Sequence, residues 1–314
     1  MSLRLDFSDL NVMIAGEVGI DEYVSGTSTR RSPECDVPVV SDIEVTRYAG
    51  MTGNLANNID SLGARSRLFT VMGGYGHSIG AFQDLLTGSS LAYVTDDSRR
   101  KTLKQRIICN DQQIARLDYE STQPLASDVE TQFVSLLCDH VARYDAVLLQ
   151  DYGKGLWTGR VLSYFLSHCE SINKKVFVDP YRGRKPEDYR GAYLIKPNLK
   201  EANEMTSFEC HKVLDMSREL NNRTGALIAL TLGPSGMIFN HIHYSAIPVS
   251  SPVDVTGAGD TTMAALTLSL LKGNSFKDSA RLANKAGSLA VQKPGPATVT
   301  IEGLLSSVIN RGEK

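Results

Sequence analysis

The sequence predicts an α/β protein: a doubly wound, mostly parallel sheet with helices on both faces, plus a small β-sheet lid. First, short apolar segments alternate with amphipathic ones from residue 129 onward, a pattern typical of parallel strands buried between helices. Second, polar residues follow the ends of these apolar segments. Third, two regions with period-two alternation carry few large apolar side chains, which suits a lid. No linker or internal repeat divides the 314 residues, so we expect one domain over 1–314.

The N-terminal half alternates between main-sheet and lid elements. Residues 11–16 form a short apolar run ending in glycine, as a buried strand does. Prolines and turn residues interrupt the period-two segments, so we expect a discontinuous lid from about 22–48 and 92–120. Its strands are expected at 32–40, 43–48, 92–94, 102–109 and 113–117. The glycine-rich stretch 50–59 opens a helix ending near Gly63, and a strand at 67–71 and a helix at 78–86 follow.

The C-terminal half is a regular alternation of helices and strands. Apolar segments of four to six residues predict strands at 146–150, 175–178, 193–196 and 226–230. Amphipathic segments predict helices at 129–142, 160–169, from about 198, at 216–222, 263–271 and 280–291. Four strand ends are polar, at 151–155, 179–180, 196–201 and 231–236, which predicts a common rim of binding residues.

Composition excludes several classes of protein. With a net charge of −2, the chain lacks the excess of basic residues that is typical of proteins binding nucleic acid or a membrane surface. No apolar run approaches the length of a membrane span and the N-terminus has no signal-peptide pattern, so we expect a cytoplasmic protein. The five scattered cysteines, Cys35, Cys109, Cys138, Cys169 and Cys210, predict neither a disulfide framework nor a zinc site. We expect His241 and His243 to be structural or exposed rather than metal ligands.

The stretch 254–262 is the most informative part of the chain. Two glycines precede an acid and a run of helix formers, which predicts a tight turn opening into a helix. Backbone N–H groups at a helix start attract anions, and Gly257 and Gly259 leave them open to a phosphate in transit. Asp260 beside this anion hole would accept the proton of an attacking hydroxyl. The alternative is that the stretch is only a loop and a helix cap.

Further candidates follow other strand ends. Asp21 would accept hydrogen bonds from polyol hydroxyls, or be an ordinary solvated acid. Asn54, in the second glycine-rich turn, offers both a donor and an acceptor to a ligand. Asn198 and Glu201 lie one helical turn apart and could hold water or Mg²⁺ near phosphates. A helix N-cap with its capping-box acid explains the same pair nearly as well.

Together these motifs resemble the ribokinase-like (PfkB-type) carbohydrate kinases over essentially the whole chain. The signature 254–262, the turn 50–54, the pair Asn198 and Glu201, and the loop 231–236 stand in the family's order. The resemblance implies ATP and Mg²⁺ as cofactors and Asp260 as the catalytic base. The other roles it implies are an anion hole from Gly257, Ala258 and Gly259, sugar binding by Asp21, Gly50 and Asn54, Mg²⁺ and phosphate contacts from Asn198 and Glu201, and a nucleotide pocket lined by Thr231, Gly233, Gly236 and Asn284.

Other stretches resemble the branch of the family that phosphorylates C1 of D-glycero-β-D-manno-heptose 7-phosphate. They are residues 31–34, 37–40, 112–120, 151–155 and 179–180. This resemblance adds Asp151 to the sugar site and implies cations for the distal phosphate, with Lys104, Arg106 and Lys154 as candidates. Glu17, Met51, Gln150 and the pair at 77–78 depart from that branch's usual Asp, Gly, Ser and acidic residues. Since Met51 and Gln150 border the expected sugar pocket, the acceptor is less defined than the ATP chemistry.

Two alternatives stay open at this stage. One is a kinase of another small sugar or nucleoside on the same scaffold. The other is a catalytically silent binding or regulatory homologue, against which the intact Asp260 argues. The exposed edges of the lid strands suggest a homodimer formed through the lid. Because the sequence ends at Lys314, the nucleotidyltransferase domain that some members carry behind the kinase is not expected.

Overall fold

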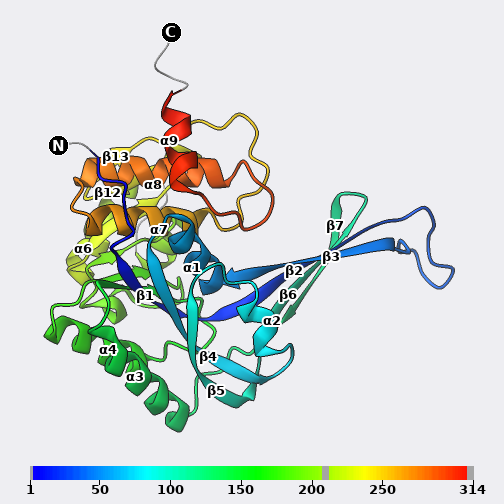
Figure 1. The fold of residues 1–314 in the computed structure, drawn as a ribbon, viewed down its shortest axis with the longest axis horizontal. Coiled ribbons are helices and arrows are strands. Elements are labelled where there is room, and N and C mark those ends of the chain that lie inside the picture. Colours follow the sequence, from blue (N-terminus) through cyan, green and yellow to red (C-terminus); the bar gives the residue numbers. More distant parts are fainter. Residues whose placement is uncertain (1–2, 207–211, 310–314) are drawn as a thin grey trace.

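The main body of the protein is a nine-stranded sheet covered by helices on both faces (Figure 1). A computed structural model describes residues 3–206 and 212–309. The strand order is β13-β12-β11-β10-β9-β8-β1-β4-β5, parallel except at β12 and β13. The strands are β1 (Asn11–Gly16), β4 (Arg65–Tyr75), β5 (Ser90–Arg100), β8 (Ala146–Gln150), β9 (Val176–Asp179), β10 (Leu194–Ile195), β11 (Leu227–Thr231), β12 (Met237–Phe239) and β13 (Ile242–Tyr244).

Alternating side chains of the central strands supply two separate cores. In β1, Val12 and Ile14 pack into one apolar cluster, whereas Met13 and Ala15 pack into the other. The first cluster includes residues of α1 (Thr52–Ser61), α7 (Ala258–Leu271) and α8 (Phe276–Ala290). The second includes residues of α3 (Ser127–Val141), α4 (Gly159–Ser171), α5 (Leu199–Met205) and α6 (Val213–Thr224). This division is the doubly wound arrangement that the alternation of strands and helices predicts.

The remaining helices are short or peripheral. They are α2 (Ile79–Gln83), α9 (Ile301–Ile309) and the 3₁₀ turns η1 (Pro186–Tyr189) and η2 (Gly233–Ser235). Within the described ranges, no helix is long and apolar enough to cross a membrane.

A second sheet of four strands forms the lid and projects from the main body (Figure 1). Its order is β3 (Ser41–Met51), β2 (Val18–Thr27), β6 (Thr102–Cys109) and β7 (Gln112–Tyr119). Strand β2 pairs antiparallel with β3 and parallel with β6, so the lid joins two segments far apart in sequence. This is the discontinuous lid that the sequence predicts.

Two details of the predicted lid are wrong. Residues 92–94 belong to β5, which pairs with β4 at the edge of the main sheet. Period-two alternation looks the same in an edge strand of either sheet, so the pattern alone could not separate them. Residues 32–40 form an irregular excursion with one isolated bridge, Arg31 to Pro38, because their prolines lack the N–H that a strand ladder needs. The lid's remaining strand is β2, a segment for which the sequence predicted no strand.

The cysteines and histidines have no metal-binding arrangement in the described part of the chain. Cys35, Cys109, Cys138 and Cys169 are free thiols, whereas Cys210 lies outside the described residues. Neither His241 nor His243 is near other ligating side chains in a group that could hold a metal within 3–206 and 212–309. His243 Nε2 lies 2.8 Å from the Ser235 carbonyl, which fits the structural role predicted for it.

Candidate active site

The turn that opens α7 has the geometry of an anion hole. Gly257 is its N-cap and has a left-handed φ of 77°. A Cβ at Gly257 would lie 2.5 Å from Asn54 Nδ2, so both the backbone conformation and the space require glycine. A Cβ at Gly259 would meet only Lys196 Nζ, at 3.8 Å. The Ala258 N–H already donates to the Val255 carbonyl at 3.3 Å. The turn is therefore open to a ligand at Gly259, which lies close to an ammonium group.

Asp260 lies in the first turn of α7 and its carboxylate is held by two amide side chains. Asn54 Nδ2, from α1, donates to Oδ2 at 2.6 Å, and Gln150 Nε2, at the end of β8, donates to Oδ1 at 2.5 Å. The residue is only 8% exposed. Burial raises the pKa of Asp260 to about 6, although the hydrogen bond from Asn54 lowers it, and Asp179 raises it further. A carboxylate of this pKa is ionised at neutral pH and still basic enough to accept a proton.

A buried lysine lies beneath the same turn. Lys196, 3% exposed, follows β10 and places Nζ 3.2 Å from Asp179 Oδ1. Burial lowers the pKa of Lys196, but Asp179, Glu201 and Asp260 raise it more, so the ammonium stays charged. The pKa of Asp179 is also raised, by burial, against the effect of Lys196. Three carboxylates thus surround one cation at the point where an incoming phosphate would add more negative charge.

The pair Asn198 and Glu201 forms a complete capping box at the start of α5. Asn198 Oδ1 accepts from the Glu201 N–H at 2.9 Å, and Glu201 Oε2 accepts from the Asn198 N–H at 2.7 Å. The helix-cap alternative raised from sequence is therefore present in the structure. Burial raises the pKa of Glu201 to about 7, with Asp179 adding to the effect and Lys196 opposing it. The capped acid consequently belongs to the same charge cluster as Lys196.

The acid Asp21 faces the site from the lid. Its Oδ1 accepts from Arg106 Nη1 at 2.7 Å, and a Cβ at Gly50 would lie 2.3 Å from its Oδ2. Glycine at position 50 therefore gives this carboxylate its space. Lys104, paired with Asp21 in the lid, places Nζ 5.7 Å from the centre of the Tyr152 ring. Burial lowers the pKa of Lys104, while Asp21 and Glu120 raise it.

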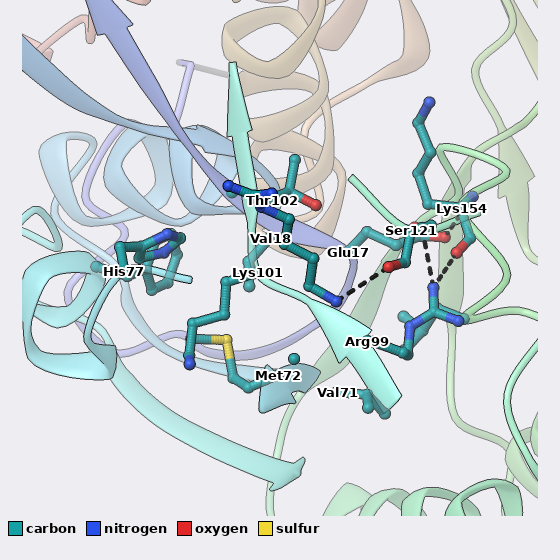
Figure 2. A pocket seen from close by; sticks show the side chains of 15 residues that line it. Glu17, Val18, Val71, Met72, His77, Arg99, Lys101, Thr102, Ser121 and Lys154 are labelled. Carbon is teal, nitrogen blue, oxygen red and sulfur yellow. Dashed lines mark hydrogen bonds between the residues drawn. The ribbon is translucent and has the colours of Figure 1, made fainter. Parts of the chain in front are cut away.

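Arg99 and Glu17 hold the loop after β8. Arg99 donates to the carbonyls of Gln123, Ser121 and Lys154, and Figure 2 shows the last two contacts. Glu17 accepts from the N–H groups of Tyr152 and Lys154, each at 3.1 Å. Burial raises the pKa of Glu17 to about 7, with a further contribution from Asp151. Glu17, which stands where the heptose-kinase branch usually has Asp, thus holds the backbone of this loop.

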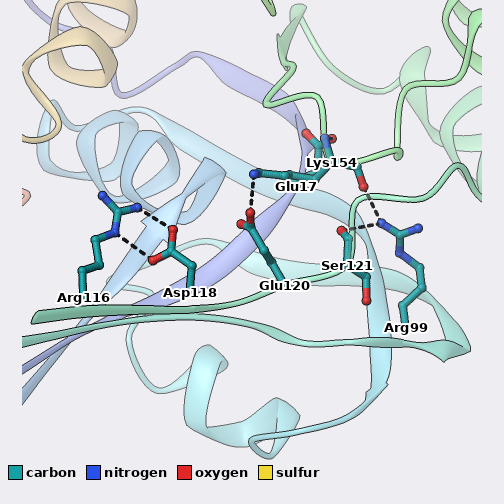
Figure 3. Close-up of polar contacts among 7 residues, drawn as sticks. All are labelled: Glu17, Arg99, Arg116, Asp118, Glu120, Ser121 and Lys154. Atoms are coloured by element: carbon teal, nitrogen blue, oxygen red, sulfur yellow. Dashed lines mark hydrogen bonds and ion pairs between the residues drawn. The ribbon is translucent and has the colours of Figure 1, made fainter.

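Asp151 and Lys154, two further predicted substrate ligands, also have partners within the chain. The side chain of Asp151 is fully enclosed, and it accepts from Arg184 Nε, from the Tyr189 hydroxyl at 3.0 Å and from the Gly153 N–H at 2.8 Å. These contacts order the loop after β8. Lys154 Nζ lies 2.5 Å from Glu120 Oε1, and Figure 3 shows this pair beside the exposed pair of Arg116 and Asp118.

The predicted nucleotide residues gather at the far end of the sheet. Thr231 Oγ1 donates to the Pro197 carbonyl at 3.4 Å, next to the capped start of α5. Gly233 and Gly236 have φ values of 56° and 93°, and a Cβ at Gly236 would lie 2.1 Å from the Tyr244 carbonyl. Asn284 Nδ2 donates to the carbonyls of Tyr244 and Ser245, at 2.8 and 3.1 Å. This amide thus ties α8 to the end of β13.

Four residues of the site are absent from the set of ligands named from sequence. They are Gln150, Tyr152, Asp179 and Lys196. Each stands at or just after the carboxyl end of a strand, in the polar rim that the sequence did indicate. Their roles depend on which strands are neighbours, and that information is not local in sequence.

Comparison with known proteins identifies relatives along nearly the whole chain. A family model described as pfkB family carbohydrate kinase matches residues 12–302. The bifunctional protein HldE of Desulfatibacillum aliphaticivorans is 36% identical over 93% of this chain and 62% of its own length. HldE of Bradyrhizobium diazoefficiens is 33% identical over 98% of this chain and 65% of its own length. The chain therefore spans less than two thirds of these relatives.

Solved structures share the fold at low sequence identity. A putative ribokinase from Agrobacterium tumefaciens superimposes with a TM-score of 0.72 and 20% identity, covering 96% of this chain and 98% of its own. The ribokinase of Thermotoga maritima gives a TM-score of 0.73 at 17% identity, covering 96% of this chain and 100% of its own. The ribokinase-like fold expected from the sequence motifs is confirmed.

Proposed function

Since the chain belongs to the pfkB family of carbohydrate kinases, we propose that it transfers the γ-phosphoryl group of ATP to C1 of D-glycero-β-D-manno-heptose 7-phosphate. Membership makes it a phosphotransferase with an alcohol acceptor and implies the use of ATP. The identity of the sugar phosphate and of its reacting hydroxyl is our proposal, and the likeness to HldE proteins supports it.

The observation that carries the proposal is the position of Asp260 beside open helix amides. Both of its oxygens are held by amide donors, which fixes the direction of their remaining lone pairs. One such lone pair would accept the proton of the acceptor hydroxyl as that oxygen attacks the γ-phosphorus. The amides of Gly257 and Gly259, with Lys196 near Gly259, would stabilise the charge that spreads over the phosphoryl oxygens. The third predicted donor, the Ala258 N–H, bonds the Val255 carbonyl in this structure.

The donor set fits a magnesium ion that is held mainly through water. Glu201 and Asp179 present carboxylates near Lys196, but within residues 3–206 and 212–309 no three ligating side chains converge on one point. Asn198 Oδ1 and Glu201 Oε2 already accept backbone N–H groups. Mg²⁺ keeps several water ligands and binds substrate phosphates, so Glu201 and Asn198 would order it indirectly. When bound, the ion would neutralise charge on the nucleotide phosphates.

The lid supports a phosphorylated acceptor. Asp21, Tyr48 and Lys104 pair across β2, β3 and β6, so they share the lid face on which Asp21 meets Gly50. Asp21 and Asn54 would bind sugar hydroxyls there. Among the three predicted phosphate cations, Arg106 and Lys154 have carboxylate partners in the described structure, and Lys104 has none there. Lys104 is therefore the best placed of the three to meet a substrate anion.

A screen of acceptors tests this proposal. We expect ADP release in a coupled assay with D-glycero-β-D-manno-heptose 7-phosphate, and a lower kcat/KM with free heptose, fructose, ribose and nucleosides. A higher kcat/KM with one of those acceptors would reassign the substrate. No ADP release with any acceptor would favour a silent binding or regulatory homologue instead.

A further inference from the structure

A second pocket lies where the chain passes from the main sheet into the lid. Lys101 is the single residue between β5 and β6, and its N–H donates to the Tyr75 carbonyl at 2.9 Å. The pocket around it is walled by the end of β4, the start of β2 and α2, with Met72, Val18 and Phe82 as apolar contacts. Asp260, Asn54 and Asp21 do not line it. Figure 2 shows His77 and Lys101 at one end and Glu17 and Arg99 at the other.

The lining is strongly cationic. Lys101, Arg99, Arg100 and Lys154 supply its positive charges, and Glu17 is the one carboxylate among the lining residues. The carboxylate of Glu17 accepts the N–H groups of Tyr152 and Lys154, as described above. The pocket therefore has an excess of positive charge that its own acid does not neutralise.

Three of the cations are already engaged. The Arg99 guanidinium donates to three carbonyls, and Lys154 pairs with Glu120. The Arg100 guanidinium lies over the Tyr119 ring, 4.4 Å from its centre. These contacts leave Lys101 as the lysine or arginine of the lining without such a partner in the described chain.

Lys101 is nearly enclosed in spite of its charge. The residue is 9% exposed, and its ammonium makes no hydrogen bond or ion pair with any residue in 3–206 or 212–309. An ammonium that has no counterion and lies on a nearly buried side chain attracts anions more strongly than one in open solvent. A small anion entering the pocket would supply the negative charge that no described residue supplies.

His77 contributes a second unsatisfied group. Its Nδ1 is buried and has no hydrogen-bond partner among the described residues. Burial lowers the pKa of His77 to about 4, with Lys101 and Arg47 adding to the effect, so the ring is neutral at pH 7. A neutral imidazole carries one N–H donor and one acceptor. It can therefore bond either an anion's oxygen or its hydroxyl.

We propose that this pocket binds a phosphoryl group, with Lys101 as its counterion and His77 as a hydrogen-bond partner. A phosphate monoester carries both the charge that Lys101 lacks and the oxygen atoms that His77 can bond. Its source is either the distal phosphate of the sugar acceptor, reaching past Glu17, or a separate phosphate-bearing metabolite. Because the pocket touches β4, β2 and Thr102 of β6, the bound group would tie the base of the lid to the main sheet.

Thermal unfolding with inorganic phosphate tests the site without turnover. We compare phosphate with chloride at equal ionic strength in the wild type, in Lys101→Met and in Lys104→Met. Ligand that binds only the native state raises Tm. Phosphate is expected to raise Tm in the wild type and in Lys104→Met, but not in Lys101→Met. The two lysines lie three positions apart, so Lys104→Met controls for lost charge and for phosphate in the active site.

Specific results would overturn the proposal. One is that phosphate does not raise Tm of the wild type. Another is that phosphate raises Tm of Lys101→Met as much as that of the wild type, or that both variants lose the rise in Tm equally. In chloride, Lys101→Met should be about as stable as the wild type, because it keeps the side-chain length and breaks no hydrogen bond or ion pair of the ammonium with a described residue. Lys101→Gln gives the same comparison with a polar side chain if the methionine variant fails to fold.

The two sources differ in their kinetics. If the acceptor's own phosphate occupies the pocket, Lys101→Met raises KM for the phosphorylated sugar and leaves KM for the unphosphorylated sugar unchanged. If a separate metabolite binds, neither KM changes while the phosphate effect on Tm is lost. Either pattern supports the anion site. Only the first source rests on the proposed substrate, and the Tm comparison stands even if no sugar phosphate is turned over.

Discussion

The carboxylate of Asp260 combines burial with two amide hydrogen bonds that oppose it. Burial raises the pKa to about 6, while the bonds from Asn54 and Gln150 lower it. The balance leaves a base that is charged at neutral pH although it is buried. Asn54 stands in the glycine-rich turn recognised from sequence, but Gln150 enters only because β8 lies next to β1 in the sheet.

The first prediction concerns the pH dependence of the reaction. Only the ionised form of Asp260 accepts a proton, so kcat/KM should rise with pH through a pKa of about 6. Gln150→Ala removes a bond that lowers this pKa, so the acidic limb should move to higher pH and kcat at pH 7 should fall. Gln83→Ala, an exposed glutamine on α2, is the control and should change neither. If kcat/KM of Gln150→Ala rises with pH over the same range as in the wild type, Gln150 does not position the base.

At the scale of single elements, the start of α7 depends on a left-handed glycine. The glycine-rich motif at 254–262 made this turn and helix predictable from local sequence. The glycine-rich stretch from Gly50 did the same for α1. The lid strands were less predictable. Period-two alternation marked 92–94 as part of the lid, yet β5 completes the main sheet, because pairing partners are not encoded locally. The closeness of Lys196, Asp179 and Gly259 depends on the same long-range pairing.

The two ends of α7 allow a matched test of this turn. Gly257 and Gly273 have nearly equal φ values, 77° and 75°, but only a Cβ at Gly257 has a close neighbour, Asn54 Nδ2. Each Gly→Ala change should cost about 1–2 kcal/mol of stability through left-handed strain. Only Gly257→Ala should also displace Asn54 and lower kcat by at least tenfold. Equal kcat values of the two variants would show that activity does not depend on the position of Asn54 beside Gly257.

On the scale of the whole molecule, the lid has one polar face toward the site and an opposite face that carries several exposed apolar side chains. Val45 pairs with Val24, which pairs with Ile107, so these side chains share the outer face. Ile43, Val45 and Leu117 are 59%, 50% and 42% exposed. Exposed apolar side chains on a sheet with open edges support the homodimer through the lid that the sequence suggests.

A charged substitution on that face tests the dimer. Val45→Asp should shift the protein from dimer to monomer in sedimentation experiments, since it places a carboxylate within the apolar contact. Ile242→Asp serves as a control, because Ile242 is similarly exposed, at 54%, but lies on β13 in the main body. A wild-type protein that sediments as a monomer at micromolar concentration would refute the dimer.

The central claim is that Asp260 removes the proton from a sugar hydroxyl beside the anion hole of α7. Asp260→Asn keeps the shape of the side chain and removes its basicity. Turnover of the wild type and of this variant should be measured with ATP and heptose 7-phosphate, and nucleotide affinity should be measured on the same samples. We expect turnover to fall by several orders of magnitude while ATP binds with nearly unchanged affinity. Near-native turnover in Asp260→Asn would contradict the account.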